Sequence, residues 1–215
     1  MTSKGPIARK LGGALVTVLL CTFVSACERI NFDDPPKPVQ RVWSEDVRLD
    51  DGSTMVVKRS VTFMESNSLA GDTYNAVETE STITFTGELA ALPPWSQALL
   101  ALVLYRDHDT KEWTVVATTT SCEVWSRRSE PRPVYWEFRL RPQGWQEVPL
   151  SSTSAERAAN LFTGYVDASQ LLPHVTVAMT QKRNADGRVG SNYLRVDMKM
   201  KIYCSHITPH SIDGR

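Results

Sequence analysis

The stretch RVWSEDVRLDDGSTMVVKRSVTF, residues 41–63, decides the fold. Apolar and polar residues alternate on both sides of Asp50-Asp51-Gly52, which is the period-two pattern of half-buried β-strands. Both apolar sets can face one side of a sheet only if the loop has an odd number of residues, and a three-residue loop with Gly52 in the left-handed conformation meets this condition. The stretch therefore predicts a β-hairpin. Its apolar positions are Trp43, Val47 and Leu49 before the turn and Met55, Val57, Val61 and Phe63 after it.

This register also places two opposite charges on the apolar face of the hairpin. Arg59 lies opposite Trp43, and Glu45 is one pair away on the same face. Such residues can form a partly buried ion pair with the arginine over the indole ring. The pair fits either a polar binding or catalytic spot or a sheet end where charged groups reach water past apolar stems, and we expect the sheet end.

Further strands follow along the chain. ETESTITFTGEL (residues 78–89) and PVYWEFRL (residues 133–140) have strand patterns. QALLALVLYR (residues 97–106) fits either a helix or a central strand, and the turn-like residues after it, followed by the β-rich WTVVATTTSCEVW (residues 113–125), favour a two-stranded hairpin.

The last predicted strand pair is HVTVAMTQK (residues 174–182) and SNYLRVDMKMKIYC (residues 191–204). The second of these alternates in the half-buried antiparallel pattern. Leu194, Val196, Met198, Met200 and Ile202 face one way, and Arg195, Asp197, Lys199 and Lys201 face the other.

One short helix is expected between these strands. Thr153 and Glu156 form a capping box before AERAANLF (residues 155–162), and Gly164 can end the helix. About eight to ten strands, one short helix and no internal repeat predict an all-β domain over residues 41–215, as an antiparallel β-sandwich or an open barrel.

The N-terminus has the features of a secretory signal peptide. Lys4, Arg9 and Lys10 precede residues 11–26, which are apolar or small throughout. The run is short for a transmembrane helix, which needs about 20 apolar residues.

The signal ends in Val24-Ser25-Ala26-Cys27. In this the chain resembles bacterial lipoproteins, whose pattern is an aliphatic residue, a small residue, Ala or Gly, and then Cys. The resemblance implies that residues 1–26 are removed and that Cys27 becomes the first mature residue and carries the lipid that anchors the protein to a membrane. The alternative is a plain cleavage site with a buried or free Cys27.

The resemblance also bears on location. In enteric bacteria an aspartate after the lipidated cysteine retains a lipoprotein in the inner membrane, and Glu28 departs from that signal. The expected location is therefore the outer membrane, facing the periplasm, with the inner membrane as the alternative.

Residues 27–40 contain Pro35, Pro36 and Pro38 and predict a semi-stiff tether, unless they lie along the domain as a first edge segment.

Composition agrees with one exported globular domain. The chain has 24 Lys+Arg and 24 Asp+Glu, and removing residues 1–26 takes away three basic residues and no acids, leaving 21 minus 24, or a charge near −3. A nucleic-acid partner would favour a strongly basic surface. The remaining 189 residues (215 minus 26) are enough for one substantial core.

Two cysteines remain once Cys21 is assigned to the signal and Cys27 to the lipid. In an oxidising compartment, Cys122 and Cys204 predict a disulfide. Two buried reduced thiols are the alternative, because a sequence does not show whether their Cβ atoms approach closely enough for a bridge.

Recognisable catalytic motifs are missing from the sequence. It holds neither a Gly-x-Ser-x-Gly elbow nor a His-Glu-x-x-His helix. His206 and His210 have metal-ligand spacing on a helix, but Pro209 disfavours a helix there, so we expect neither a metal nor another cofactor. Residues 106–109, Arg-Asp-His-Asp, could act in acid-base chemistry but are also ordinary turn residues.

Aromatic residues and arginines gather between residues 125 and 145. These types dominate interface energetics and can also stack on glycans or phosphate groups. They predict a binding surface, unless the aromatic rings line the core while the arginines decorate a loop. The candidate binding residues are Trp125, Arg127, Arg128, Arg132, Tyr135, Trp136 and Trp145.

Two functions fit these features. The preferred one is a non-catalytic lipoprotein whose β-domain binds a protein partner in the periplasm, as an envelope factor or as an immunity protein against a toxin. The alternative is a cell-envelope hydrolase or carbohydrate-active enzyme with a site assembled from distant strands. A cleft holding two carboxylates would favour the enzyme, and an apolar patch with satisfied charges near residues 125–145 would favour the binder.

Overall fold

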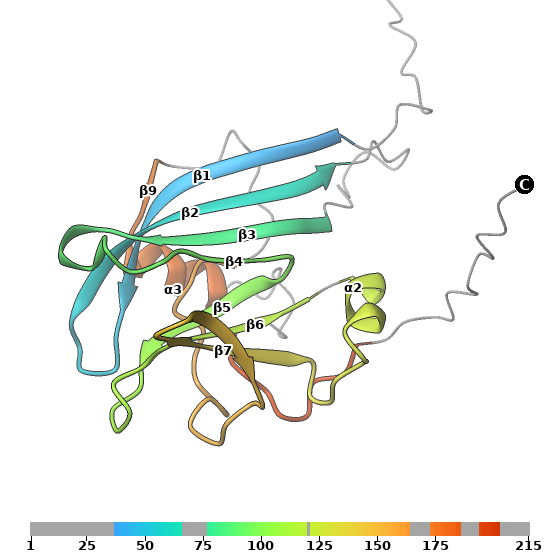
Figure 1. Cartoon of the computed structure of the whole chain (residues 1–215). Helices are drawn as coiled ribbons and strands as arrows, with labels where there is room; N and C mark the ends of the chain where they lie inside the picture. The colour runs from blue at the N-terminus through green and yellow to red at the C-terminus, as the bar shows by residue number, and fades with distance from the viewer. Residues whose placement is uncertain (1–36, 66–76, 120, 164–172, 186–193, 203–215) are drawn as a thin grey trace, which may run out of the picture. The chain divides into compact units, whose positions relative to one another are not determined.

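Two β-sheets pack face to face in this computed structural model, which describes residues 37–65, 77–119, 121–163, 173–185 and 194–202. The sheets do not close into a barrel (Figure 1), which confirms the predicted all-β sandwich. In spatial order, one sheet holds β4 (Trp95–Gln97), β3 (Val77–Phe85), β2 (Thr54–Glu65), β1 (Lys37–Arg48) and β9 (His174–Val175). The other holds β5 (Leu100–Arg106), β6 (Trp113–Thr118), β7 (Tyr135–Arg141) and β8 (Gly144–Val148).

Helices are short in the described part of the chain. They are η2 (Gly87–Leu89), α2 (Cys122–Arg127) and α3 (Val177–Ala185), and none of them is long and apolar enough to cross a membrane. The strand β1 begins at Lys37, so residues 37–40, which the sequence assigned to the tether, belong to the first sheet. The predicted signal, Cys27, Glu28 and the rest of the tether lie outside the described residues.

The hairpin of β1 and β2 has the predicted register. Trp43 lies opposite Arg59. The Leu49 amide donates to the Ser53 carbonyl at 2.9 Å, so three residues form the loop, and Gly52 lies at φ +81°. Because L residues are strained at that φ and glycine has no Cβ, Gly52 allows the chain to reverse here. The three-residue loop is confirmed.

The second sheet explains the apolar run at residues 97–106. Every residue of β6 and all but the last of β5 are buried, and strands covered on both faces carry such continuous apolar runs. The predicted hairpin of these two strands is confirmed. The strand over residues 113–125 was predicted too long, because β6 ends at Thr118 and the Ser121 hydroxyl caps α2 by accepting from the Val124 amide at 3.3 Å.

The core lies between the inner faces of the two sheets. Aromatic rings cross it in contact: Trp95 meets Phe138 edge-on at 5.6 Å between ring centroids, and Trp145 stacks on Phe85 at 6.2 Å. Trp145 also donates its indole N–H to the Pro93 carbonyl at 2.9 Å, which joins β8 to the segment before β4. Burying these large side chains is the main source of stability in such a core.

Residues 150–163, which we call the crossing segment, cover the outer face and free edge of the second sheet. The Asn160 and Leu161 amides donate to the Leu102 carbonyl at 3.2 and 3.1 Å. The Asn160 side chain accepts from the Leu104 amide at 2.9 Å and donates to the Leu104 carbonyl at 2.7 Å. It also donates to the Arg48 carbonyl at 2.9 Å, so one amide group joins β5 to β1.

The helix predicted at residues 155–162 is therefore wrong. The segment is irregular, because the Asn160 and Leu161 amides bond to the edge of β5 and the Glu156 and Ala159 amides bond to the Val196 and Leu194 carbonyls, instead of continuing a helical pattern. Ser151 and Ser154 also do not cap or continue a helix, because both hydroxyls donate to Glu137 on β7. A capping box is a local signal, and these distant partners override it.

The predicted C-terminal strand pair is also wrong. Among the described residues of the pair, only His174–Val175 forms a strand, which pairs in parallel with β1 and is followed by α3, while residues 191–193 and 203–204 lie outside the described part of the chain. The Thr176 hydroxyl accepts from the Met179 amide at 3.4 Å at the start of this helix, and Thr180 and Asn184, four residues apart, share its buried face. Residues 194–202 make one isolated bridge, between Arg195 and Ala158.

Replacing Asn160 with Ala should destabilise the protein by about 2 to 4 kcal/mol, because it leaves backbone groups of β5 and β1 without partners. Asn160→Asp should be similarly destabilising, since a carboxylate can accept from Leu104 but cannot donate to the two carbonyls. Urea unfolding followed by tryptophan fluorescence measures the change. The control is Gln146→Ala, an exposed amide on β8. Equal stabilities for the Asn160 and Gln146 variants would contradict the role of Asn160 in joining the sheets.

Candidate binding site

The aromatic residues that the sequence proposed for binding lie mostly in the core. Trp125, Tyr135 and Trp136 are 8, 3 and 4% exposed, and Trp145 is partly buried against Phe85. The rings are thus buried, as in the alternative interpretation: Trp125 and Trp136 belong to the core between the sheets, and Tyr135 packs with Val196 on the other face of the second sheet. The polar edge of Trp125 is satisfied, because its indole N–H donates to the Pro131 carbonyl at 3.2 Å.

Two of the three arginines that the sequence proposed for binding form ion pairs with glutamates of the domain. Arg127 pairs with Glu123 on the exposed side of α2. Arg128 lies 5.6 Å from the centroid of the Trp136 ring, and its guanidinium bonds to Glu147 of β8 at 2.8 Å and Gln97 of β4 at 2.7 Å. Arg128 therefore holds the edges of the two sheets together.

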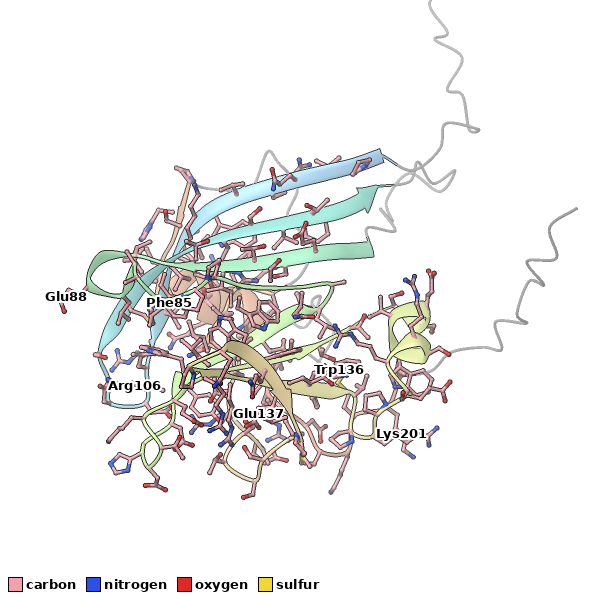
Figure 2. The ribbon with its side chains drawn as sticks, in the orientation of Figure 1. Phe85, Glu88, Arg106, Trp136, Glu137 and Lys201 are labelled. Carbon is pink, nitrogen blue, oxygen red and sulfur yellow. The ribbon has the colours of Figure 1, made fainter. Side chains whose placement is uncertain are left out.

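Arg132 is the remaining proposed arginine, and it lies at the mouth of a cleft. Its guanidinium lies 6.0 Å from the centroid of the Trp125 ring. The cleft has a volume of about 920 Å³. Trp125 and residues 131–134 form one wall, and residues 197–202 form the other. Figure 2 shows Lys201, from the second wall, at the end of the domain where α2 lies.

A tight turn shapes the second wall. The Asp197 carboxylate accepts from the Lys199 amide at 2.8 Å, and the Asp197 carbonyl accepts from the Met200 amide at 2.9 Å. The turn is fastened to the sheet, because the Asp197 amide donates to the Tyr135 hydroxyl at 3.0 Å. This turn is why residues 194–202, the described part of the predicted strand over residues 191–204, do not form a strand.

The charges that line the cleft are mainly positive. Arg132, Lys199 and Lys201 are exposed and make no ion pair with the residues that the structure describes. Asp197 is the acid among the lining residues, and it serves the turn. Three cations and one anion give the walls a charge of +2, in a chain whose formal net charge is zero.

The cleft also offers apolar surface. Met200 and Ile202 are partly buried, and Met198 is 43% exposed. Methionine side chains are flexible and polarisable, so they adapt to different apolar groups. Sequence reasoning missed Lys199, Lys201 and these methionines as neighbours of Trp125, because it gave them to opposite faces of one strand. Asp197, a turn-forming residue in the middle of the run, was the signal against that strand.

Two buried carboxylates are the other chemically notable groups. The Glu45 side chain is fully buried beside Arg59, at 3.4 Å between carboxylate and guanidinium. The sheet end that the sequence favoured is therefore wrong, because neither head reaches water. Burial raises the pKa of Glu45, against the opposing effects of Arg59 and of the hydrogen bonds from the Phe162 amide and the Trp43 indole.

Glu137 on β7 is also fully buried. Burial alone would raise the pKa of Glu137, but hydrogen bonds from the Ser151 amide and hydroxyl, the Ser154 hydroxyl and Arg139 outweigh it, and the pKa lies below the ordinary value for glutamate. The donor distances are 2.7, 2.7, 2.8 and 2.7 Å. The carboxylate therefore fixes the start of the crossing segment to the sheet.

These carboxylates belong to different sheets and are enclosed by donors from their own chain. Neither lines the cleft, so neither can meet a substrate there. The residues at 106–109 act structurally, because Asp107 accepts from the Asp109 and Thr110 amides at 3.0 and 2.8 Å while His108 is exposed to solvent.

The remaining predicted residues concern metals and disulfides. His206, His210 and Cys204 lie outside the described residues. Cys122, at the start of α2, is disulfide-bonded, and its pairing with Cys204 stays a prediction. Within the described ranges, no group of three His, Cys, Asp or Glu side chains could hold a metal ion.

We compared the chain with known proteins. None of the protein families, curated proteins and solved structures compared with the chain matches it.

The low pKa of Glu137 predicts a share of stability that depends on pH. Its stabilising effect is complete above the pKa of an unfolded glutamate, about 4.3, and is lost as the pH falls further and the folded carboxylate takes up a proton. At pH 7, the free energy of unfolding of Glu137→Gln should be about 2 to 4 kcal/mol lower than that of the wild type. The difference should narrow as the pH falls from about 5 to about 3.

Urea unfolding of both proteins across this pH range measures the difference. Acids elsewhere titrate alike in both, so the difference isolates Glu137. Glu88→Gln, a change at an exposed glutamate on η2 that Figure 2 labels, is the matched control and should be neutral at every pH. If the difference in free energy of unfolding between the wild type and Glu137→Gln does not vary with pH, the low pKa of Glu137 is contradicted.

Proposed function

We propose that this chain is a bacterial lipoprotein, anchored by lipid on Cys27, whose β-sandwich binds a protein partner on the periplasmic side of the outer membrane. The partner would belong to the cell envelope or be a toxin that the domain neutralises. The domain acts by binding, without catalysis.

Support for the anchor comes from the sequence. The basic start, the apolar run and Val24-Ser25-Ala26-Cys27 follow one another in the order that lipoproteins have. Residues 28–36 separate the cysteine from β1. Fully extended at roughly 3.3 Å per residue, they could reach about 30 Å. The domain would thus stand close to the membrane, and its partner would have to meet it there.

The observation that carries the binding function is the cleft between residues 131–134 and residues 197–202. Cations without an ion pair among the described residues line it beside exposed Met198 and the edge of Trp125. Interfaces combine such apolar anchors with a charged rim. The two fully buried carboxylates, Glu45 and Glu137, by contrast already accept hydrogen bonds from donors of the domain itself.

Cys27→Ala should abolish the anchor. We expect the wild-type protein extracted from membranes to have the mass of a chain beginning at Cys27 plus acyl chains, and the variant to lack both the acyl mass and membrane attachment. The matched control is Cys21→Ala, which lies in the predicted signal and should leave the mature mass unchanged. An unlipidated soluble wild type, or a chain that keeps its first 26 residues, would contradict the proposal.

The binding function can be tested in cells by photo-crosslinking. A photoreactive amino acid at position 198 should form a protein adduct on illumination, because Met198 lies in the cleft with 43% of its surface exposed. Val42, on the outer face of β1 and 44% exposed, is the matched control position and should form none. No adduct at position 198, or equal adducts at both positions, would contradict partner binding through the cleft.

A further inference from the structure

We infer that the cleft binds an acidic, partly apolar segment of the partner's polypeptide. This inference rests on the proposed function and names the chemistry that the partner must present. The residues that carry it are Trp125, Arg132, Lys199, Met200, Lys201 and Ile202.

Charge is the first argument. Seven arginines of the described part form ion pairs with carboxylates of the domain. The cations of the cleft form no ion pair with a described carboxylate, although the mature chain carries more acids than bases. Arg132 reaches the cleft from one wall, and Lys199 and Lys201 reach it from the other. Carboxylates entering between the walls would meet cations on both sides.

Shape is the second argument, and it favours a polypeptide over a membrane surface. The cations line a concave site, and a bilayer surface is too flat to enter it. The volume of about 920 Å³ is near the upper end for a small-ligand pocket, which suits a few side chains of an extended segment. The net negative charge of the mature chain also opposes adsorption to anionic lipid.

The apolar side chains in the walls of the cleft indicate that the bound segment must carry apolar residues as well as acidic ones. Trp125 is held by its hydrogen bond to Pro131 and gives a rigid surface, whereas Met200 and Ile202 offer a softer one. Apolar side chains between the carboxylates would cover this surface and exclude water from the ion pairs. The expected segment therefore mixes Glu or Asp with residues such as Leu or Phe.

Binding of a synthetic peptide to the full-length lipoprotein in a non-ionic detergent tests this inference. The probe is a short peptide of Glu, Leu, Ser and Gly with a neutral dye, and its match has Gln at each Glu. Fluorescence anisotropy at about 50 mM salt should show binding of the acidic peptide only. Lys199→Ser with Lys201→Ser should weaken that binding about tenfold. Lys199→Arg with Lys201→Arg should retain it.

Lys58→Ser with Lys182→Ser is the matched control. It removes the same charge from exposed positions on β2 and α3, away from the cleft, and should leave the affinity unchanged. An equal loss in this control would contradict the inference, since the effect would then be a general one of charge. Binding of the Gln peptide as tightly as the Glu peptide would also contradict it.

Other occupants of the cleft are distinguished by separate measurements on the same variants, with the wild type and the lysine variant reconstituted into vesicles or analysed for oligomeric state. Lysine-dependent binding to vesicles with anionic lipid, without binding of the acidic peptide, would identify a membrane instead. Lysine-dependent self-association would identify a second copy of the chain. A protein adduct at position 198 without acidic-peptide binding would overturn this inference and leave the proposed function standing, whereas the absence of both would overturn the two together.

Discussion

The buried pair of Glu45 and Arg59 imposes the strictest condition on this fold. Two charges without access to water are costly unless each is surrounded by partners. Arg59 lies over the Trp43 ring at 5.5 Å and bonds to Ser81 on β3 at 3.4 Å. Glu45 accepts from Arg59, from the Trp43 indole and from the Phe162 amide. The pair thus ties three strands of one sheet to the crossing segment.

A second carboxylate works in the same way at the other end of that segment. Glu137 holds Ser151 and Ser154 to the outer face of the second sheet, and Asn160 fills the edge of β5 between the two carboxylates. Residues 194–196 then bond along the crossing segment, since Glu156 donates its amide to Val196 and Val196 donates to Arg157. This chain of contacts brings the turn at Asp197 opposite Trp125, and the cleft lies between them.

The parts of the fold that depend on local pattern were predictable. The hairpin of β1 and β2 follows from alternation and Gly52, and even the contact of Arg59 with Trp43 and Glu45 follows from the register. The burial of that pair was not predictable, because it depends on the distant segment that covers it. The same cause made the helix predicted at residues 155–162 wrong, because backbone groups of that segment bond to residues far away in the sequence. The last strand pair was wrong for local reasons: α3 takes up residues 177–185, and the Asp197 side chain turns the chain at residues 197–200. The cleft was half predicted, with Trp125 and Arg132 named and Lys199 and Lys201 missed.

The crossing segment has a consequence for the order in which the molecule can assemble. It runs antiparallel to the end of β1, and its bonds from Phe162 to Glu45, from Asn160 to Arg48 and from Arg157 to Asp50 join residues 117, 112 and 107 positions apart. Folds dominated by such distant contacts form slowly. The hairpin is made first in synthesis, yet its buried carboxylate lacks an essential donor until residue 162 is present. If the chain is exported N-terminus first, as the proposed function requires, most of it must cross the membrane before the earliest strands reach their final state.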